Sequence, residues 1–175
     1  MKLPYHFLLV ITLLTVFFTS CSSDDKGVTT PRASCSDNIQ NQGELGIDCG
    51  GPCNDCTPEL TANVDGAFWE ADGNINTSVN GNSIIFLSGN GTSTLSMIYT
   101  GPFTIGTYNL AAATYGITAT GQNFIGNTGT ITFSSWNSSE GVVSGSFSFE
   151  AFDLSGVGDT VTVTQGQFNL VPYQP

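Results

Sequence analysis

Val143-Ser144-Gly145-Ser146-Phe147-Ser148-Phe149-Glu150-Ala151-Phe152 is the stretch that decides the fold, because small or polar side chains alternate along it with larger apolar ones. Successive side chains of a strand point to opposite faces of a sheet, so this alternation predicts a strand with one buried face. We expect Phe147, Phe149 and Ala151 to face the core, and Ser146, Ser148, Glu150 and Phe152 to face solvent.

Shorter runs with the same alternation predict further strands over 60–64, 84–87, 95–99, 107–110, 115–119, 131–133 and 161–170. Turn signals separate several of them, including Asp65-Gly66, after which the chain returns through Phe68 and Trp69, and Gly89-Asn90-Gly91. No segment has a sustained helical period. About eight to ten such strands predict an all-β domain over 58–175, built as an antiparallel β-sandwich or a small barrel.

Several motifs of this domain occur in a characteristic order. Thr61-Ala62-Asn63-Val64-Asp65-Gly66 precedes Phe68-Trp69-Glu70-Ala71, Gly106-Thr107-Tyr108 follows, and the end carries Gly145-Ser146-Phe147-Ser148-Phe149 and Val161-Thr162-Val163-Thr164-Gln165-Gly166-Gln167-Phe168. In this order the motifs resemble a family of Bacteroidota lipoprotein domains that is catalogued as being of unknown function. The resemblance implies a β fold and implies no activity.

The N-terminus has the features of an export signal. Lys2 is followed by an apolar run over 7–18, which is shorter than the roughly 20 residues that a membrane helix needs. These proportions predict a signal peptide over 1–20. Phe18-Thr19-Ser20-Cys21 resembles the lipobox of bacterial lipoproteins, with Phe18 where Leu, Val or Ile is usual. The resemblance implies cleavage before Cys21 and acylation of its thiol, whereas the alternative is an ordinary secretory signal with an unmodified cysteine.

The residues after Cys21 predict a location and a tether. Ser22-Ser23-Asp24-Asp25-Lys26 resembles the acidic tag with which Bacteroidota send lipoproteins to the cell surface, which implies an outer-membrane protein that faces the outside. Acyl chains contribute about 0.8 kcal/mol per buried methylene, so two or three chains anchor a protein stably in the membrane. The segment 21–34 is nearly devoid of apolar side chains, so we expect a disordered tether there.

Four cysteines, Cys35, Cys49, Cys53 and Cys56, define a small module over 35–57. An even number of close cysteines in an exported chain predicts two disulfides, and so short a segment needs cross-links to hold a fold. A four-thiolate zinc site is the alternative, which the oxidising compartment disfavours. The spacing leaves all three disulfide pairings open.

The module resembles short Cys-rich modules of bacterial extracellular proteins, which read C-x-D-G-x-x-N-x-x-E-x-x-x-D-C-G-G-x-C-x-x-C. Asn38 stands where these modules usually have Gly. The segment also carries oxygen ligands at short intervals, the type of donor that Ca²⁺ prefers. A calcium site is therefore a hypothesis, and the alternative is that the same side chains cap turns: Asp37, Asn41, Glu44 and Asp48.

The charge balance excludes several classes of partner. The chain has fourteen Asp and Glu, three Lys and Arg, and one His. Lys2 and His6 lie in the signal peptide, so Lys26 and Arg32 are the cations of the mature chain. Because binding to phosphate backbones depends on cationic side chains, we expect no nucleic-acid partner. For the same reason we expect no direct binding to anionic lipid head groups, so the lipid on Cys21 is the expected contact with the membrane.

The same composition limits catalysis. Without imidazole or an interior amine, the mature chain cannot build Ser-His-Asp or Cys-His hydrolysis, Schiff-base chemistry or a His-ligated zinc enzyme. A pair of carboxylates, as in glycosidases, is the common hydrolytic design that remains. The candidate carboxylates of the β domain are Glu59, Asp65, Glu70, Asp72, Glu140, Glu150, Asp153 and Asp159.

Exposed aromatic side chains are candidate ligand contacts. If Ile131 and Phe133 face the core, strict alternation places Trp136 on the opposite face, and Phe152 also points outward. The alternative for Trp136 is a strand end that twists the ring back over the core, and Trp69 is expected in the core.

Together these observations predict a lipid-anchored, non-enzymatic binding module for a glycan or a protein, with no cofactor apart from the hypothetical Ca²⁺. A structural or envelope-associated lipoprotein without a small ligand is the alternative, and a two-carboxylate glycoside hydrolase is the third possibility.

Overall fold

The computed structural model describes residues 34–154 and 158–174 of the 175-residue chain. The predicted signal peptide over 1–20, the acylated Cys21 and all but the last residue of the predicted tether lie outside these ranges. The chain divides into two compact units, Met1–Ser34 and Cys35–Pro175, and the second is described below. Among the described residues there is no helix with the length and hydropathy needed to cross a bilayer.

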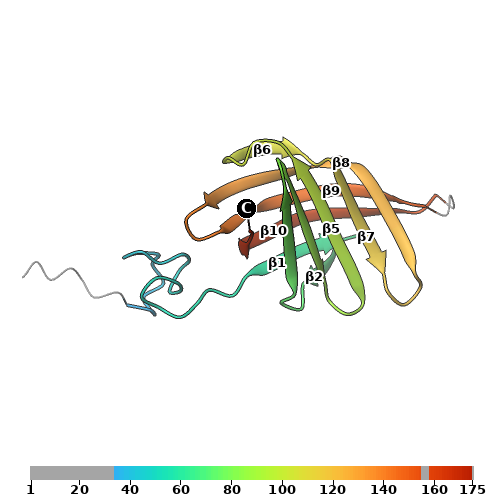
Figure 1. Cartoon of the computed structure of the whole chain (residues 1–175). Helices are drawn as coiled ribbons and strands as arrows, with labels where there is room; N and C mark the ends of the chain where they lie inside the picture. Colours follow the sequence, from blue (N-terminus) through green and yellow to red (C-terminus); the bar gives the residue numbers. More distant parts are fainter. Residues whose placement is uncertain (1–33, 155–157, 175) are drawn as a thin grey trace, which may run out of the picture. The chain divides into compact units, whose positions relative to one another are not determined.

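In the described part of the chain, ten strands form one antiparallel sheet (Figure 1). Their bounds are β1 Glu59–Val64, β2 Ala67–Glu70, β3 Ile75–Asn80, β4 Ser83–Gly89, β5 Ser93–Thr100, β6 Gly106–Asn109, β7 Ala112–Ile117, β8 Gln122–Asn137, β9 Val142–Asp153 and β10 Thr160–Pro172. The strand order is β2-β1-β10-β9-β8-β7-β5-β4-β3, and β6 pairs with β8 beyond the point where β7 ends.

The sheet curls into a half-barrel, so strands far apart in the strand order approach each other. The Thr77 hydroxyl of β3 donates a hydrogen bond to the Pro172 carbonyl of β10. The backbone N–H of Asp72, just after β2, donates to the Gly89 carbonyl of β4. In Figure 1 the strands β4, β5 and β7 cross over β9 and β10. The prediction of an all-β antiparallel fold is thus confirmed, in its barrel-like form.

The core fills the inside of the curl. Phe86, Phe133 and Phe168 are fully buried and pack edge-on or tilted, with Phe86 and Phe168 centroids 5.2 Å apart. The pattern predicted for the 143–152 stretch is confirmed, since its odd-numbered apolar residues are buried and Phe152 is 51% exposed. Trp69 is buried as expected. Strand β3 was not predicted, because it carries only two apolar side chains, Ile75 and Val79.

The module over 35–57 is held by two disulfides, as predicted. Cys35 pairs with Cys53 and Cys49 pairs with Cys56, so the two loops that the disulfides close overlap along the sequence. The pairing uses all four sulfurs, which rules out the alternative four-thiolate zinc site. Between the cross-links the backbone forms only turns and one isolated bridge, Gly46 to Cys49.

Candidate functional site

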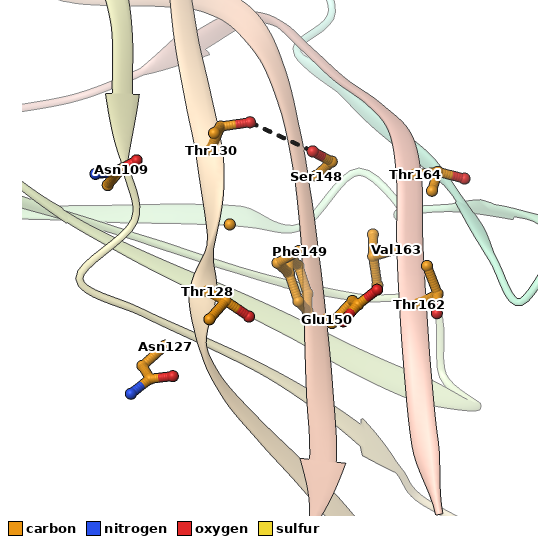
Figure 2. Close-up of a pocket in the computed structure, with 11 residues that line it drawn as sticks. Asn109, Asn127, Thr128, Thr130, Ser148, Phe149, Glu150, Thr162, Val163 and Thr164 are labelled. Atoms are coloured by element: carbon orange, nitrogen blue, oxygen red, sulfur yellow. Dashed lines mark hydrogen bonds between the residues drawn. The ribbon is translucent and has the colours of Figure 1, made fainter.

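The outer face of β8, β9 and β10 is hollowed into a groove of about 560 Å³ (Figure 2). We call it the polar groove, because its lining is mainly hydroxyl and amide side chains with one carboxylate. The lining residues are Asn109, Asn127, Thr128, Gly129, Thr130, Ser148, Phe149, Glu150, Thr162, Val163 and Thr164.

Strand register arranges these side chains in rows across the sheet. Thr128 of β8 lies opposite Glu150 of β9, and Glu150 lies opposite Thr162 of β10. The next row pairs Thr130 with Ser148, whose hydroxyl oxygens are 3.3 Å apart (Figure 2). Directly opposed side chains on one face of a sheet are close enough to act together on one ligand.

Two β-bulges flank the rows and explain the hollow. One lies in β8 between Ile125 and Thr128, and the other in β10 between Val163 and Gly166. A bulge inserts an extra residue, which bends the strand and increases its twist. Glycine is required in the β8 bulge, because a Cβ on Gly126 would lie 1.9 Å from the carbonyl oxygen of Glu150.

The groove carries a negative charge that no residue in the described ranges neutralises. Glu150 is exposed, and its carboxylate accepts no hydrogen bond from any residue in the described part of the chain. The sequence has no Lys, Arg or His after Arg32. Hydroxyls both donate and accept hydrogen bonds, whereas a carboxylate only accepts them. The lining therefore fits a neutral ligand rich in hydroxyl groups and disfavours an anionic one.

Strict alternation fails at Trp136, and the alternative, in which the strand end turns the ring back over the core, is the arrangement found. A bulge between Phe133 and Ser135 reverses the alternation, so Trp136 pairs with Val143 and turns to the same side as Phe133. The indole stacks on Phe103 with ring centroids 4.9 Å apart, and it meets Phe133 edge-on at 4.8 Å. Because Phe103 already covers one face of the indole, that face cannot stack on a sugar.

Trp136 nevertheless borders a second, more apolar groove of about 650 Å³. Tyr173 packs on the indole from another side, with ring centroids 5.0 Å apart. Ile105 is the exposed apolar side chain at its rim. The lining residues are Phe103, Thr104, Ile105, Trp136, Ser138 and Tyr173.

Phe152 points outward as predicted and has an apolar neighbour. It lies opposite Ile125 in the β8–β9 register, and Ile125 is 44% exposed. We call these two residues the apolar platform. The sequence indicated Phe152, but Ile125 was missed because its partner is 27 positions away along the chain.

The four proposed calcium ligands are close together, and the carboxylate groups of the three acidic ones accept hydrogen bonds in the turns of the module. Asp48 accepts hydrogen bonds from the backbone N–H groups of Asp37 and Asn38, at 2.8 and 2.9 Å. Asp37 accepts from the Asn41 side chain at 3.2 Å, and Glu44 from the Asn41 backbone at 3.1 Å. These contacts favour the turn-capping interpretation. The Asn41 side-chain oxygen is buried and has no hydrogen-bond partner among the residues that the structure describes, which is the observation in favour of a cation.

The carboxylates do not gather at the polar groove. Glu150 is the acidic residue among those that line it. Asp65, which belongs to the β1–β2 turn, accepts a hydrogen bond from the Thr162 backbone N–H at 2.8 Å and so links that turn to β10. A glycosidase would need a second carboxyl group about 5 to 9.5 Å from the first across one cleft.

Most lining residues of the polar groove were not singled out from the sequence. A signal for them exists, because hydroxyl residues alternate in Thr128-Gly129-Thr130-Ile131-Thr132, in Ser144-Gly145-Ser146-Phe147-Ser148 and in Thr160-Val161-Thr162-Val163-Thr164. The pattern does not show that these three strands are neighbours.

Comparison with known proteins gives one match. No curated protein and no solved structure matches the chain. A family model matches residues 56–172, which is nearly the whole β domain together with the last cysteine of the module. The chain therefore belongs to the family described as Domain of unknown function (DUF6252).

Proposed function

We propose that this protein is an exported, lipid-anchored, non-enzymatic binding module whose β domain binds a glycan in the polar groove. The observation that carries the proposal is the lining of the groove, which places hydroxyls, amides and one carboxylate in register across three strands. A ligand that enters such a site must satisfy many polar groups at once, because unpaired polar groups cost free energy when they lose water.

The charge and the chemistry of the groove support a glycan over a nucleic acid or an anionic ligand. Carbohydrate hydroxyls donate to the Glu150 carboxylate and exchange hydrogen bonds with Thr130 and Ser148. The absence of basic residues after Arg32 in the sequence leaves nothing to attract a phosphate or a sulfate.

Export and anchoring rest on Cys21 and on the disulfides. Two disulfides in a short module are typical of an oxidising compartment outside the cytoplasm. An acylated Cys21 would hold the protein at the outer membrane, with the β domain facing the outside. Mass spectrometry of the native protein is expected to find an acylated Cys21 as its first residue, and globomycin is expected to block processing. An unacylated N-terminus would refute the anchor.

A glycan array with the purified protein tests the binding function, followed by calorimetry with the glycans that bind. The double variant Thr130→Val/Ser148→Ala removes the hydroxyl pair of the groove. Ser83→Ala/Thr100→Val is the matched control, because these hydroxyls also face each other, at 2.8 Å, on β4 and β5. Two lost hydrogen bonds of about 0.5–1.5 kcal/mol each predict an affinity that is weaker by roughly 5-fold to 150-fold, with no change in the control.

The other functions make different predictions in the same experiment. Binding of no glycan would contradict the proposal, and a pull-down would then separate a protein partner from a purely structural role. Slow release of sugar from a bound glycan, abolished in Glu150→Gln, would indicate a hydrolase instead.

A further inference from the structure

We infer that the glycan site extends beyond the polar groove onto the apolar platform of Ile125 and Phe152, so that the ligand is an extended, neutral oligosaccharide. This inference rests on the proposed function and specifies the length and charge of its ligand.

The platform is continuous with the groove. Ile125 and Phe152 form the row next to the one that contains Thr128 and Glu150, on the same outer face. Phe152 follows Glu150 by two positions, which keeps both side chains on one side of β9. From the Ser148 row to the Phe152 row the strand rises about 13 Å, at roughly 3.3 Å per residue. That span is longer than one sugar ring.

The apolar platform and the polar groove suit the two kinds of surface that a sugar presents. Sugar rings have apolar C–H faces and polar hydroxyl edges, and aromatic side chains offer a rigid apolar surface to such faces. Phe152 is 51% exposed and Ile125 is 44% exposed, so the platform is open to a ligand. A chain lying across both parts would place ring faces on Phe152 and hydroxyl edges toward Glu150 and Ser148.

The negative charge of Glu150 determines which oligosaccharides can bind in this way. Glu150 lies between the platform and the Thr130–Ser148 pair, so any ligand that spans both parts passes over its carboxylate. With no cation in the sequence after Arg32, an acidic sugar at this position would meet an uncompensated negative charge. Neutral hydroxyls instead donate to the carboxylate in charge-assisted hydrogen bonds.

The first test compares Phe152→Ala with Phe68→Ala. Phe68 is the matched control, because it is 71% exposed on the edge strand β2 and does not line the polar groove. Affinities are measured by calorimetry for the glycan that binds on the array and for its fragments down to the monosaccharide. We expect Phe152→Ala to weaken binding of the longest fragment about tenfold, equivalent to about 1.4 kcal/mol, and to leave the monosaccharide unchanged. Phe68→Ala should change neither.

The second test uses Glu150→Gln, with Glu70→Gln as the matched control on β2. The unmodified protein is expected to bind a neutral oligosaccharide more tightly than an analogue in which one hexose is replaced by the corresponding uronic acid. Glu150→Gln should reduce the ratio of the affinity for the neutral oligosaccharide to that for the acidic analogue about tenfold, whereas Glu70→Gln should leave this ratio unchanged.

The outcomes separate this inference from the function on which it rests. If Thr130→Val/Ser148→Ala weakens glycan binding but Phe152→Ala does not at any length, the extended site is wrong and the groove remains. If no glycan binds, the proposed function itself fails. If Phe152→Ala only alters self-association in sedimentation, the platform is a contact between copies of this chain, which also overturns the inference.

Discussion

The indole N–H of Trp69 donates a buried hydrogen bond of 2.7 Å to the Ser93 hydroxyl. Trp69 belongs to β2, at one edge of the sheet, and Ser93 begins β5, near the other edge. The Ser93 hydroxyl in turn donates to the Asn90 side chain at 3.1 Å. This chain of contacts holds the curled sheet together across its open side, where no strand pairing connects β2 with β5.

Ser93→Ala tests this contact. The change leaves a buried indole N–H without an acceptor, and we expect the free energy of unfolding to fall by about 1–3 kcal/mol. Trp69→Phe removes the donor instead, and the double variant should cost less than the sum of the two single changes. Urea unfolding with the disulfides intact measures all three, and strict additivity would contradict the contact.

Trp136→Ala distinguishes a packing role from a binding role. Because the indole packs on Phe103, Phe133 and Tyr173, we expect the free energy of unfolding to fall by about 3 kcal/mol, the low end for a buried aromatic, since the ring is half-buried. Glycan affinity of the folded fraction should not change, because Trp136 does not line the polar groove. Lost affinity at unchanged stability would instead assign the ligand to the second groove.

Because of the buried Tyr99 side chain, we expect the protein to lose stability in alkali. Burial, and to a lesser extent the neighbouring Tyr108, raise the pKa of Tyr99 above its ordinary value of 10.0. The folded state therefore holds the phenolic proton more tightly than the unfolded state does. The resulting stabilisation is complete below pH 10.0 and is lost as the pH rises through the folded-state pKa.

Urea unfolding on both sides of pH 10.0 measures this effect, with Tyr99→Phe as the comparison. The variant should be less stable at neutral pH by about 1 kcal/mol, because it lacks the hydrogen bond from the Tyr99 hydroxyl to the Pro102 carbonyl at 2.9 Å. Its stability should fall less steeply in alkali than that of the unmodified protein. Equal slopes would show that Tyr99 does not contribute.

Asp48→Ala separates the two interpretations of the acidic cluster in the cysteine module. Loss of its carboxylate frees the N–H groups of Asp37 and Asn38, so hydrogen exchange at these two amides should accelerate whether or not Ca²⁺ is present. The calcium hypothesis predicts in addition a heat of binding and a higher Tm when Ca²⁺ is added to the unmodified protein, both lost in Glu44→Gln. Absence of heat and of stabilisation would leave turn capping as the role of the cluster.

Prediction from the sequence succeeded where a pattern is local and failed where a bulge interrupts it. The alternation through Phe147, Phe149 and Ala151 continues unbroken in β9, and the inward and outward sets were assigned correctly. In β8 the same reasoning failed beyond Phe133, because one extra residue before Ser135 moves Trp136 to the inner side. Nothing in the residues Ser134 and Ser135 distinguishes a bulge from a regular strand.

The sequence by itself determined the strand-forming stretches, which side of each strand is apolar, the presence of a cross-linked module and the lack of basic groups, because these depend on residues close together in the chain or on composition alone. Tertiary structure alone decided which strands are neighbours, which cysteines pair and where the bulges lie. Thr128, Glu150 and Thr162 form one row only because β8, β9 and β10 pair in a particular register. That register is set by the packing of the whole curled sheet, since strand pairing gains its free energy from side chains that the chain brings together over long separations.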